Sequence, residues 1–224
     1  MARFDRLTVL NTMIDGGLVP LFYNDDVQLC KDVIHALVAG GARVVEFTNR
    51  GDQALEVFKQ LVPYFAKSEP QLILGVGSVV DAPTAGIAMA YGTNFVVGPM
   101  LNADVARICN RRKVAYMPGC GSVSEISAAE ELGVEICKVF PGTQVGGPGF
   151  IKAVLAPMPW SKLMPTGGVS LDEANIKGWI SAGAVCVGMG SDMVRKEWLA
   201  ARDFEKVTAS VRQALQWIRE ARAK

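Results

Sequence analysis

Two charged side chains stand in segments that otherwise have the composition of buried β-strands. Glu46 interrupts the apolar segment at residues 44–48, and Lys138 interrupts the one at residues 136–140. Burying an unpaired charge costs several kcal/mol, which a purely structural sequence would avoid. The alternatives are a Glu46–Lys138 ion pair that is neutral for stability, or exposure at a sheet edge. Because both charges stand near the carboxyl end of a strand, we interpret them as functional residues.

A lysine in such a place is suited to act as a nucleophile toward a carbonyl group. Burial favours the neutral amine, which is the reactive form. The iminium that follows draws electrons, so the bond between the α and β carbons can break while a neighbouring carboxylate moves the protons. The chain has one histidine, His35, in a segment expected to be helical, so a histidine cluster around a metal is excluded. Any demanding chemistry must therefore come from Lys, Glu, Asp, Arg, Cys or a cofactor, and Glu46 is the expected proton carrier.

Two further features fit a small anionic substrate. Arg50 follows Glu46 by four residues, where its guanidinium could hold a carboxylate with two hydrogen bonds. Thr166-Gly167-Gly168 and Gly188-Met189-Gly190-Ser191 follow the last two expected strands, where barrels commonly bind phosphate through backbone N–H groups. A solvated loop arginine and ordinary tight turns are the alternatives.

The elements that must position these residues alternate between strand and helix along the whole chain. After a leading helix at about 4–15, we expect strands at 19–22, 44–47, 72–74, 95–97, 114–117, 136–140, 162–164 and 185–187. Helices are expected at 25–39, 52–66, 81–91, 102–111, 122–132, 149–156, 171–182 and 201–221. This order predicts one domain, residues 1–224, folded as a (β/α)8 TIM barrel with an extra N-terminal helix. The rival, a doubly wound open sheet, lacks its GxGxxG fingerprint.

Three strand-to-helix turns carry signals for the start of a helix. Ser122-x-x-Glu125 and Ser170-x-x-Glu173 have the pattern of capping boxes, and Asp81-Ala-Pro83 that of an N-cap followed by an early proline. In a barrel these turns surround the face where catalysis occurs.

Composition excludes several classes of function. A net charge of +1 over 224 residues gives no electrostatic case for binding nucleic acid or a membrane surface. The five cysteines are odd in number and include no CxxC, so we expect free buried thiols in a reducing cytoplasm. No segment has the ~18 unbroken apolar residues of a membrane span. The sequence predicts a cytoplasmic protein that binds a small molecule.

The sequence resembles the 2-keto-3-deoxy-6-phosphogluconate (KDPG) / 4-hydroxy-2-oxoglutarate (KHG) aldolase family from about residue 19 to residue 194. The motifs that carry the resemblance are Val45-Glu46-Phe47-Thr48-Asn49-Arg50, Gly75-Val76-Gly77-Ser78-Val79, Pro118-Gly119, Lys138-Val139-Phe140-Pro141 and Pro165-Thr166-Gly167-Gly168-Val169. The sequence departs from the family pattern at Ser78, where threonine is usual, and at Gly-Met-Gly-Ser, where Gly-Gly-Ser is commoner.

The resemblance implies a homotrimer that cleaves a 4-hydroxy-2-oxo acid, with KDPG as the expected substrate and pyruvate and glyceraldehyde 3-phosphate as products. It also implies that no metal and no cofactor are needed. It assigns Lys138 as the Schiff-base residue and Glu46 as the proton shuttle. The other implied contacts are Arg50 and Ser78 to the pyruvyl carboxylate, Thr166 and Phe140 near the aldehyde carbon, and Gly167, Gly168, Gly190 and Ser191 to the phosphate. The residues alone leave two alternatives open. One is an isomerase or synthase of phosphosugars without a covalent step, and the other is a non-catalytic barrel that binds a phosphorylated metabolite.

Overall fold

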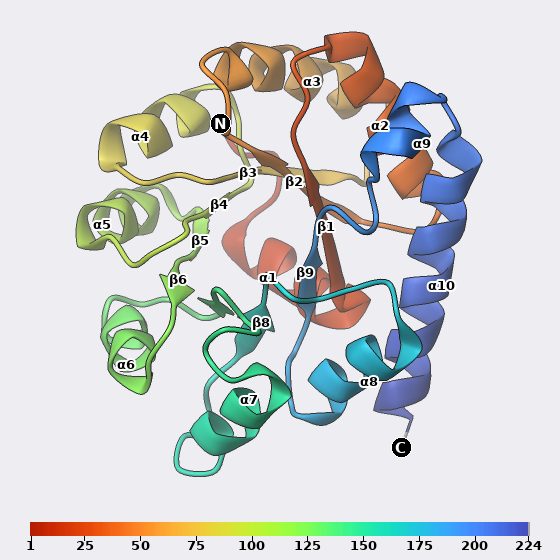
Figure 1. The fold of residues 1–224 in the computed structure, drawn as a ribbon. Helices are drawn as coiled ribbons and strands as arrows, with labels where there is room; N and C mark the ends of the chain where they lie inside the picture. Colours follow the sequence, from red (N-terminus) through yellow and green to blue (C-terminus); the bar gives the residue numbers. More distant parts are fainter. Residues whose placement is uncertain (224) are drawn as a thin grey trace.

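The computed structural model describes residues 1–223, and its strands form a ring that helices surround (Figure 1). The strands are β1 (Leu18–Phe22), β2 (Val44–Thr48), β3 (Ile73–Gly77), β4 (Phe95–Val97), β5 (Ala115–Met117), β6 (Gly119–Cys120), β7 (Cys137–Val139), β8 (Leu163–Pro165) and β9 (Val187–Met189). The helices are α1 (Arg6–Gly16), α2 (Val27–Ala39), α3 (Ala54–Ser68), α4 (Ala82–Ala90), α5 (Ala103–Arg112), α6 (Val123–Glu131), α7 (Gly147–Leu155), α8 (Glu173–Ser181), α9 (Lys196–Ala200) and α10 (Phe204–Arg222).

Parallel pairing closes the strands into a barrel. One sheet has the order β5-β4-β3-β2-β1-β9 and a second has the order β6-β7-β8. Only Pro118 separates β5 from β6, so these two short segments together occupy the position of one strand of the barrel. On the other side of the second sheet, a bridge between Thr166 and Gly188 links β8 to β9. The expected (β/α)8 barrel with an N-terminal helix is confirmed.

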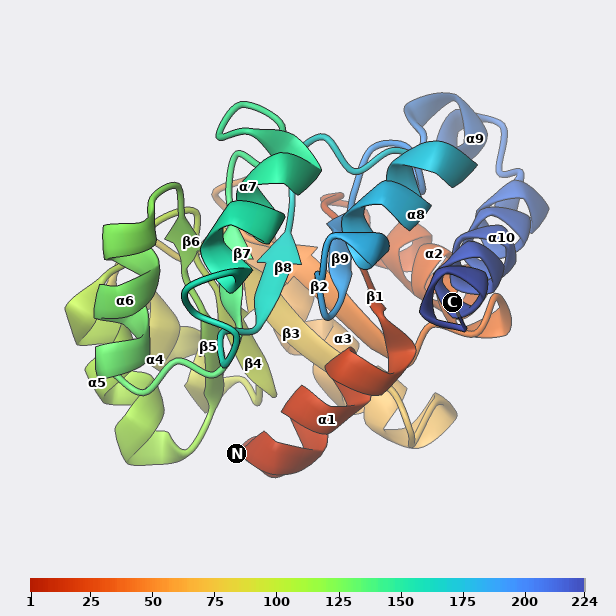
Figure 2. The ribbon, with the colours of Figure 1, turned by 90° about the horizontal axis from the view of Figure 1, so that it is seen from below.

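Helix α1 closes the end of the barrel where the strands begin (Figure 2). It starts at the N-cap Asp5 and ends at Gly17, whose φ of 73° is left-handed. Val9, Leu10 and Met13 of α1 are buried among the inward side chains of the strands. Because α1 fills this end, the barrel is open for a site only at its opposite end, where α9 lies.

Two of the three helix-start signals are confirmed and one is wrong. Asp81 caps α4 by accepting from the N–H of Thr84, and Ser122 caps α6 by accepting from the N–H of Glu125. Ser170 does not cap α8, which begins three residues later. Its N-cap is Asp172, whose carboxylate accepts a hydrogen bond from the N–H of Asn175.

The C-terminal part of the chain differs from expectation in two respects. The last strand, expected at 185–187, runs from Val187 to Met189. The short helix α9 was not expected, whereas α10 lies where a helix was expected and packs against α2 and α8. The five cysteines are free and buried, as expected. Within residues 1–223, no helix combines the length and apolar character that a membrane crossing needs.

Candidate active site

Glu46 and Lys138 both project from strands into the barrel interior. Glu46 is 2% exposed and Lys138 is 6% exposed. Val44 and Ile136, which share strand faces with them, belong to the inner apolar cluster that α1 closes. The ion pairs within residues 1–223 include neither residue, and Glu46 Oε2 has no hydrogen-bond partner there. The ion-pair and edge-exposure alternatives are therefore wrong, because both groups are buried and neither takes part in an ion pair among the described residues.

Burial shifts both groups toward their uncharged forms. It raises the pKa of Glu46 above the usual 4.5, although the positive charges of Lys138 and Arg50 oppose this rise. It lowers the pKa of Lys138 below the usual 10.5, against the negative charge of Glu46, and the cation of Arg50 lowers it further. The lysine amine therefore loses its proton readily, and the nearby carboxyl group can take it. Together they form a nucleophile paired with a proton acceptor.

The immediate surroundings of the pair are shaped to fit these two side chains. A Cβ built on Gly77, the last residue of β3, would lie 1.7 Å from Glu46 Oε1, so the carboxylate occupies the space that a side chain would take. The ring of Phe140 lies 4.8 Å from Lys138 Nζ. An aromatic face at this distance favours a cation on the nitrogen, which suits an iminium as well as an ammonium.

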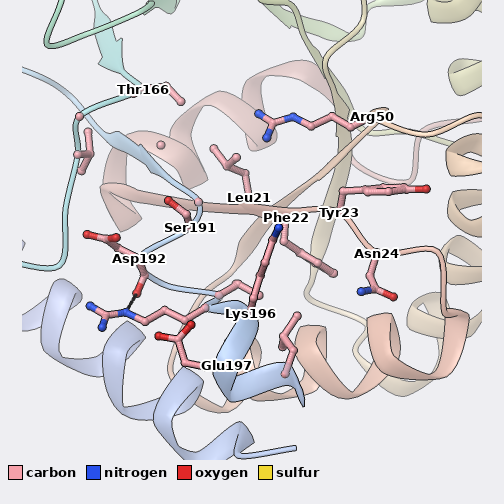
Figure 3. Close-up of a pocket in the computed structure, with 18 of the residues that line it drawn as sticks. Leu21, Phe22, Tyr23, Asn24, Arg50, Thr166, Ser191, Asp192, Lys196 and Glu197 are labelled. Atoms are coloured by element: carbon pink, nitrogen blue, oxygen red, sulfur yellow. Dashed lines mark hydrogen bonds between the residues drawn. The ribbon is translucent and has the colours of Figure 1, made fainter. Parts of the chain in front are cut away.

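A cavity of about 1050 Å³ opens at the carboxyl ends of the strands (Figure 3). Phe140, whose ring lies 4.8 Å from Lys138 Nζ, lines the cavity, whereas Lys138 and Glu46 lie behind its wall and are not among the lining residues. Arg50 extends into it from the end of β2, and its Nε donates a hydrogen bond of 3.4 Å to Ser78 Oγ. Ser78 is half-buried and has a left-handed φ of 58°, which directs the chain toward Arg50 at the end of β3. The structure thus brings together the residues expected at the keto-acid end.

Thr166 contributes an unpaired hydroxyl to the cavity wall. Its side chain is 6% exposed, lines the cavity, and has an Oγ1 atom without a hydrogen-bond partner within residues 1–223. Buried hydroxyl groups are normally satisfied, so this atom has unused hydrogen-bonding capacity at the end of β8. It packs against Gly188, where any Cβ would be too close to it.

The two glycine-containing loops, which follow β8 and β9, both contribute to the cavity wall. Gly167, Gly168, Gly190 and Ser191 all line it. Gly167 and Gly168 have left-handed φ values of 82° and 86°, and Asn175 holds the turn by donating to Gly168 O. Among the described residues, the N–H groups of Gly168 and Ser191 have no acceptor. Such free donors can bind an anion.

Sequence reasoning missed the charged residues of the segment after Ser191. Asp192, Arg195, Lys196 and Glu197 also line the cavity, from α9 and the turn before it. The available signal was a run of charges directly after the last strand.

His35 lies outside this site. Its ring nitrogens lie 2.9 Å from Glu69 Oε1 and 3.0 Å from Tyr64 Oη, on the outer helices α2 and α3. Within residues 1–223, no three His, Cys, Asp or Glu side chains gather as a metal site would require.

The family model of KDPG and KHG aldolase matches residues 9–210. The 2-dehydro-3-deoxy-phosphogluconate aldolase of Pseudoalteromonas atlantica is 32% identical over 89% of this chain and 90% of its own length. The KHG/KDPG aldolase of Escherichia coli is 29% identical over 90% of this chain and 92% of its own. The crystal structure of the Zymomonas mobilis 2-keto-3-deoxy-6-phosphogluconate aldolase with 3-phosphoglycerate matches with a TM-score of 0.80 and 28% identity, covering 93% of this chain and 95% of that one.

These matches span the whole barrel, from α1 to α10, and include every residue of the buried pair and the cavity loops. They favour an aldolase over the isomerase, synthase and non-catalytic alternatives. The chain belongs to the KDPG and KHG aldolase family and is a lyase that acts as a pyruvate aldolase.

Proposed function

We propose that this enzyme cleaves KDPG into pyruvate and glyceraldehyde 3-phosphate, with Lys138 forming the Schiff base. The observation that carries the proposal is a buried lysine with a lowered pKa and a buried carboxyl group outside any ion pair, next to a cavity lined by Arg50 and by backbone N–H groups that can bind anions. The neutral amine of Lys138 is suited to attack a ketone.

In the first half of the reaction, the neutral amine of Lys138 adds to the C2 carbonyl and gives a carbinolamine. Glu46, in its protonated form, supplies the proton with which the C2 hydroxyl leaves as water, and the iminium remains. The raised pKa of Glu46 suits it to hold this proton. The ring of Phe140, 4.8 Å from Nζ, stabilises the positive charge of the iminium.

In the second half, the Glu46 carboxylate removes the proton of the C4 hydroxyl. The C3–C4 bond breaks, its electrons pass to the iminium to form an enamine, and the aldehyde is released. Protonation at C3 and addition of water at C2 then release pyruvate and restore the free lysine. Arg50 and Ser78 bind the pyruvyl carboxylate throughout, and the unpaired hydroxyl of Thr166 binds the oxygen at C4.

The assignment of KDPG as the substrate rests on the far loops of the cavity. The free N–H groups of Gly168 and Ser191 and the Ser191 hydroxyl suit a phosphate. The Zymomonas mobilis relative is described with 3-phosphoglycerate, a phosphorylated acid, and the Pseudoalteromonas atlantica relative is named for a phosphogluconate substrate.

The experiment compares pyruvate release from KDPG, its galactonate epimer and KHG in the wild type and in Ser191→Ala. Loss of one hydrogen bond to a charged group costs about 1.5–3 kcal/mol, so kcat/KM for the phosphorylated substrates should fall by roughly ten- to a hundredfold. KHG, which has no phosphate, should be affected much less. Ser127→Ala, on the exposed face of α6, is the matched control. If Ser191→Ala slows all substrates equally, these loops do not select a phosphorylated substrate.

The proposed enzyme also assembles as a homotrimer. Four large apolar side chains remain exposed by 44–47% on adjacent units of the barrel, namely Val80, Ile87, Met100 and Val123. Such a patch is typical of a surface that another subunit covers. Sedimentation should therefore give three times the mass of one chain, and Ile87→Asp should lower it. A monomer at micromolar concentration would contradict the assembly.

A further inference from the structure

Lys196 is a cation at the cavity that has no structural partner. It is the first residue of α9, it is exposed, and it lines the cavity. In Figure 3 its side chain extends from α9 toward Leu21 and Phe22 of β1. Within residues 1–223, its ammonium group takes part in no ion pair or hydrogen bond. The group is therefore free to bind a ligand in the cavity.

The neighbouring charges are more constrained. Arg195 donates from Nε to the backbone oxygen of Asp192 at 3.2 Å, and its guanidinium lies 4.9 Å from the ring of Trp198. The Asp192 carboxylate accepts from the N–H of Leu171 at 3.2 Å, which ties the turn before α9 to the loop after β8. Lys196, unlike Arg195, is thus a cation at the cavity that no protein group holds in place among the described residues.

The carboxylates near the far loops make a compensating cation necessary for binding an anion. Asp192 and Glu197 both line the cavity, and Asp192 directly follows Ser191 in the chain. The N–H groups of the loops carry only partial charges, whereas these carboxylates repel an approaching anion. A lysine on a flexible stem can move to meet the anion as a point charge.

We propose that Lys196 determines specificity by binding the negatively charged terminus of the substrate, whose keto-acid end Arg50 holds. This inference rests on the proposed function, because it assigns the far end of the same cavity. A dianion gains more from the added cation than a carboxylate does, and a neutral terminus gains least.

The test is the dependence of kinetics on the charge of the terminus. KDPG ends in a phosphate, KHG in a carboxylate, and unphosphorylated 2-keto-3-deoxygluconate in a hydroxyl group. Lys196→Met should lower kcat/KM for KDPG by about ten- to a hundredfold, mainly through KM, with a smaller loss for KHG and the smallest for the neutral substrate. Lys196→Arg should restore most of the KDPG activity because it keeps the cation.

Two further variants separate a local effect from one of net charge. Lys152→Met on α7 removes an exposed lysine that does not line the cavity, so its KM for KDPG should equal that of the wild type. Glu197→Gln removes a repelling carboxylate and should lower KM for KDPG, opposite to Lys196→Met. An equal loss for all three substrates in Lys196→Met, or no loss for KDPG, would overturn the proposal.

A binding measurement keeps this outcome distinct from failure of the proposed function. Inorganic phosphate, titrated by calorimetry, should bind the wild type more tightly than Lys196→Met. If the wild type formed no covalent adduct with pyruvate, the Schiff-base mechanism would fall, but weaker phosphate binding in Lys196→Met would still support an anion site. Equal phosphate binding by the two proteins would refute that site even if the aldolase chemistry held.

Discussion

Replacing Gly77 by alanine should displace the catalytic carboxylate without touching any chemical group of the site. The new Cβ would lie 1.7 Å from Oε1 of Glu46, 2.4 Å from Cδ and 2.7 Å from Cγ, whereas ordinary contacts begin at 3.4 Å. The carboxylate must therefore move by well over 1 Å. Because a misplacement of about 1 Å can cost roughly a hundredfold in rate, we expect kcat to fall by about a hundredfold or more. Overpacking of this kind also costs about 1–3 kcal/mol of stability.

The assay is pyruvate release coupled to lactate dehydrogenase, with circular dichroism and Tm to show that the variant is folded. Gly149→Ala is the matched control, because nothing lies within 4 Å of its new Cβ and the residue is helical. Its kcat should equal that of the wild type, and its Tm should not fall. A folded Gly77→Ala enzyme with wild-type kcat would refute the idea that the position of Glu46 controls the reaction.

Four other predictions concern the same site. Glu46→Gln keeps the shape and loses the proton carrier, so kcat should fall by roughly 10²–10⁴, as pyruvate release will show. Thr166→Val removes a hydroxyl that has no protein partner, so Tm should not drop, while kcat/KM should fall by about tenfold. Arg50→Ala should mainly raise KM, and an unchanged KM with a collapsed kcat would contradict its anchoring role. Because burial lowers the pKa of Lys138, kcat/KM should rise with pH and level off below pH 10.5, and a rise that continues above it would contradict the shift.

The sequence predicted that Glu46 and Lys138 lie inside the barrel because strand alternation and burial leave few alternatives. A charge within an apolar strand of a barrel points either into the barrel or toward its helices, and Glu46 and Lys138 both point inward. The alternation of elements was equally clear, since each expected strand overlaps an observed one. These patterns did not predict where each strand ends, and they did not predict the short helix α9.

Glycines account for the two strands that were placed too early. The third strand was expected to end at residue 74, yet β3 continues through Gly75 and Gly77. Gly75 leaves space for the ring of Phe95, as Gly77 does for Glu46. Gly188, within β9, likewise leaves space for Thr166. In isolation a glycine suggests a turn, but here it marks the close approach of a neighbouring side chain, which one sequence does not reveal.

The turns of the last two β/α units were the least predictable part of the site. Helix α9 has five residues, too few for a periodic pattern, so its contribution to the cavity was missed. At α8 the expected N-cap was Ser170, but Asp172 caps the helix instead. The N–H of Ser170 donates a hydrogen bond to the Asn175 side chain. Ser and Asp are both good N-cap residues, and the tertiary structure decides which of two neighbouring candidates caps the helix. The sequence motif alone does not contain this information.

The central claim is that Lys138 forms a covalent bond with the keto acid, and reductive trapping tests it most directly. The enzyme is incubated with pyruvate and sodium borohydride, digested, and analysed by tandem mass spectrometry, with Lys138→Arg as the control because a guanidinium is too basic to attack the ketone. The account predicts one reduced pyruvyl adduct per chain, on the peptide that contains Lys138, and none in the variant. An adduct on another lysine, or no adduct in the folded wild-type enzyme, would contradict it.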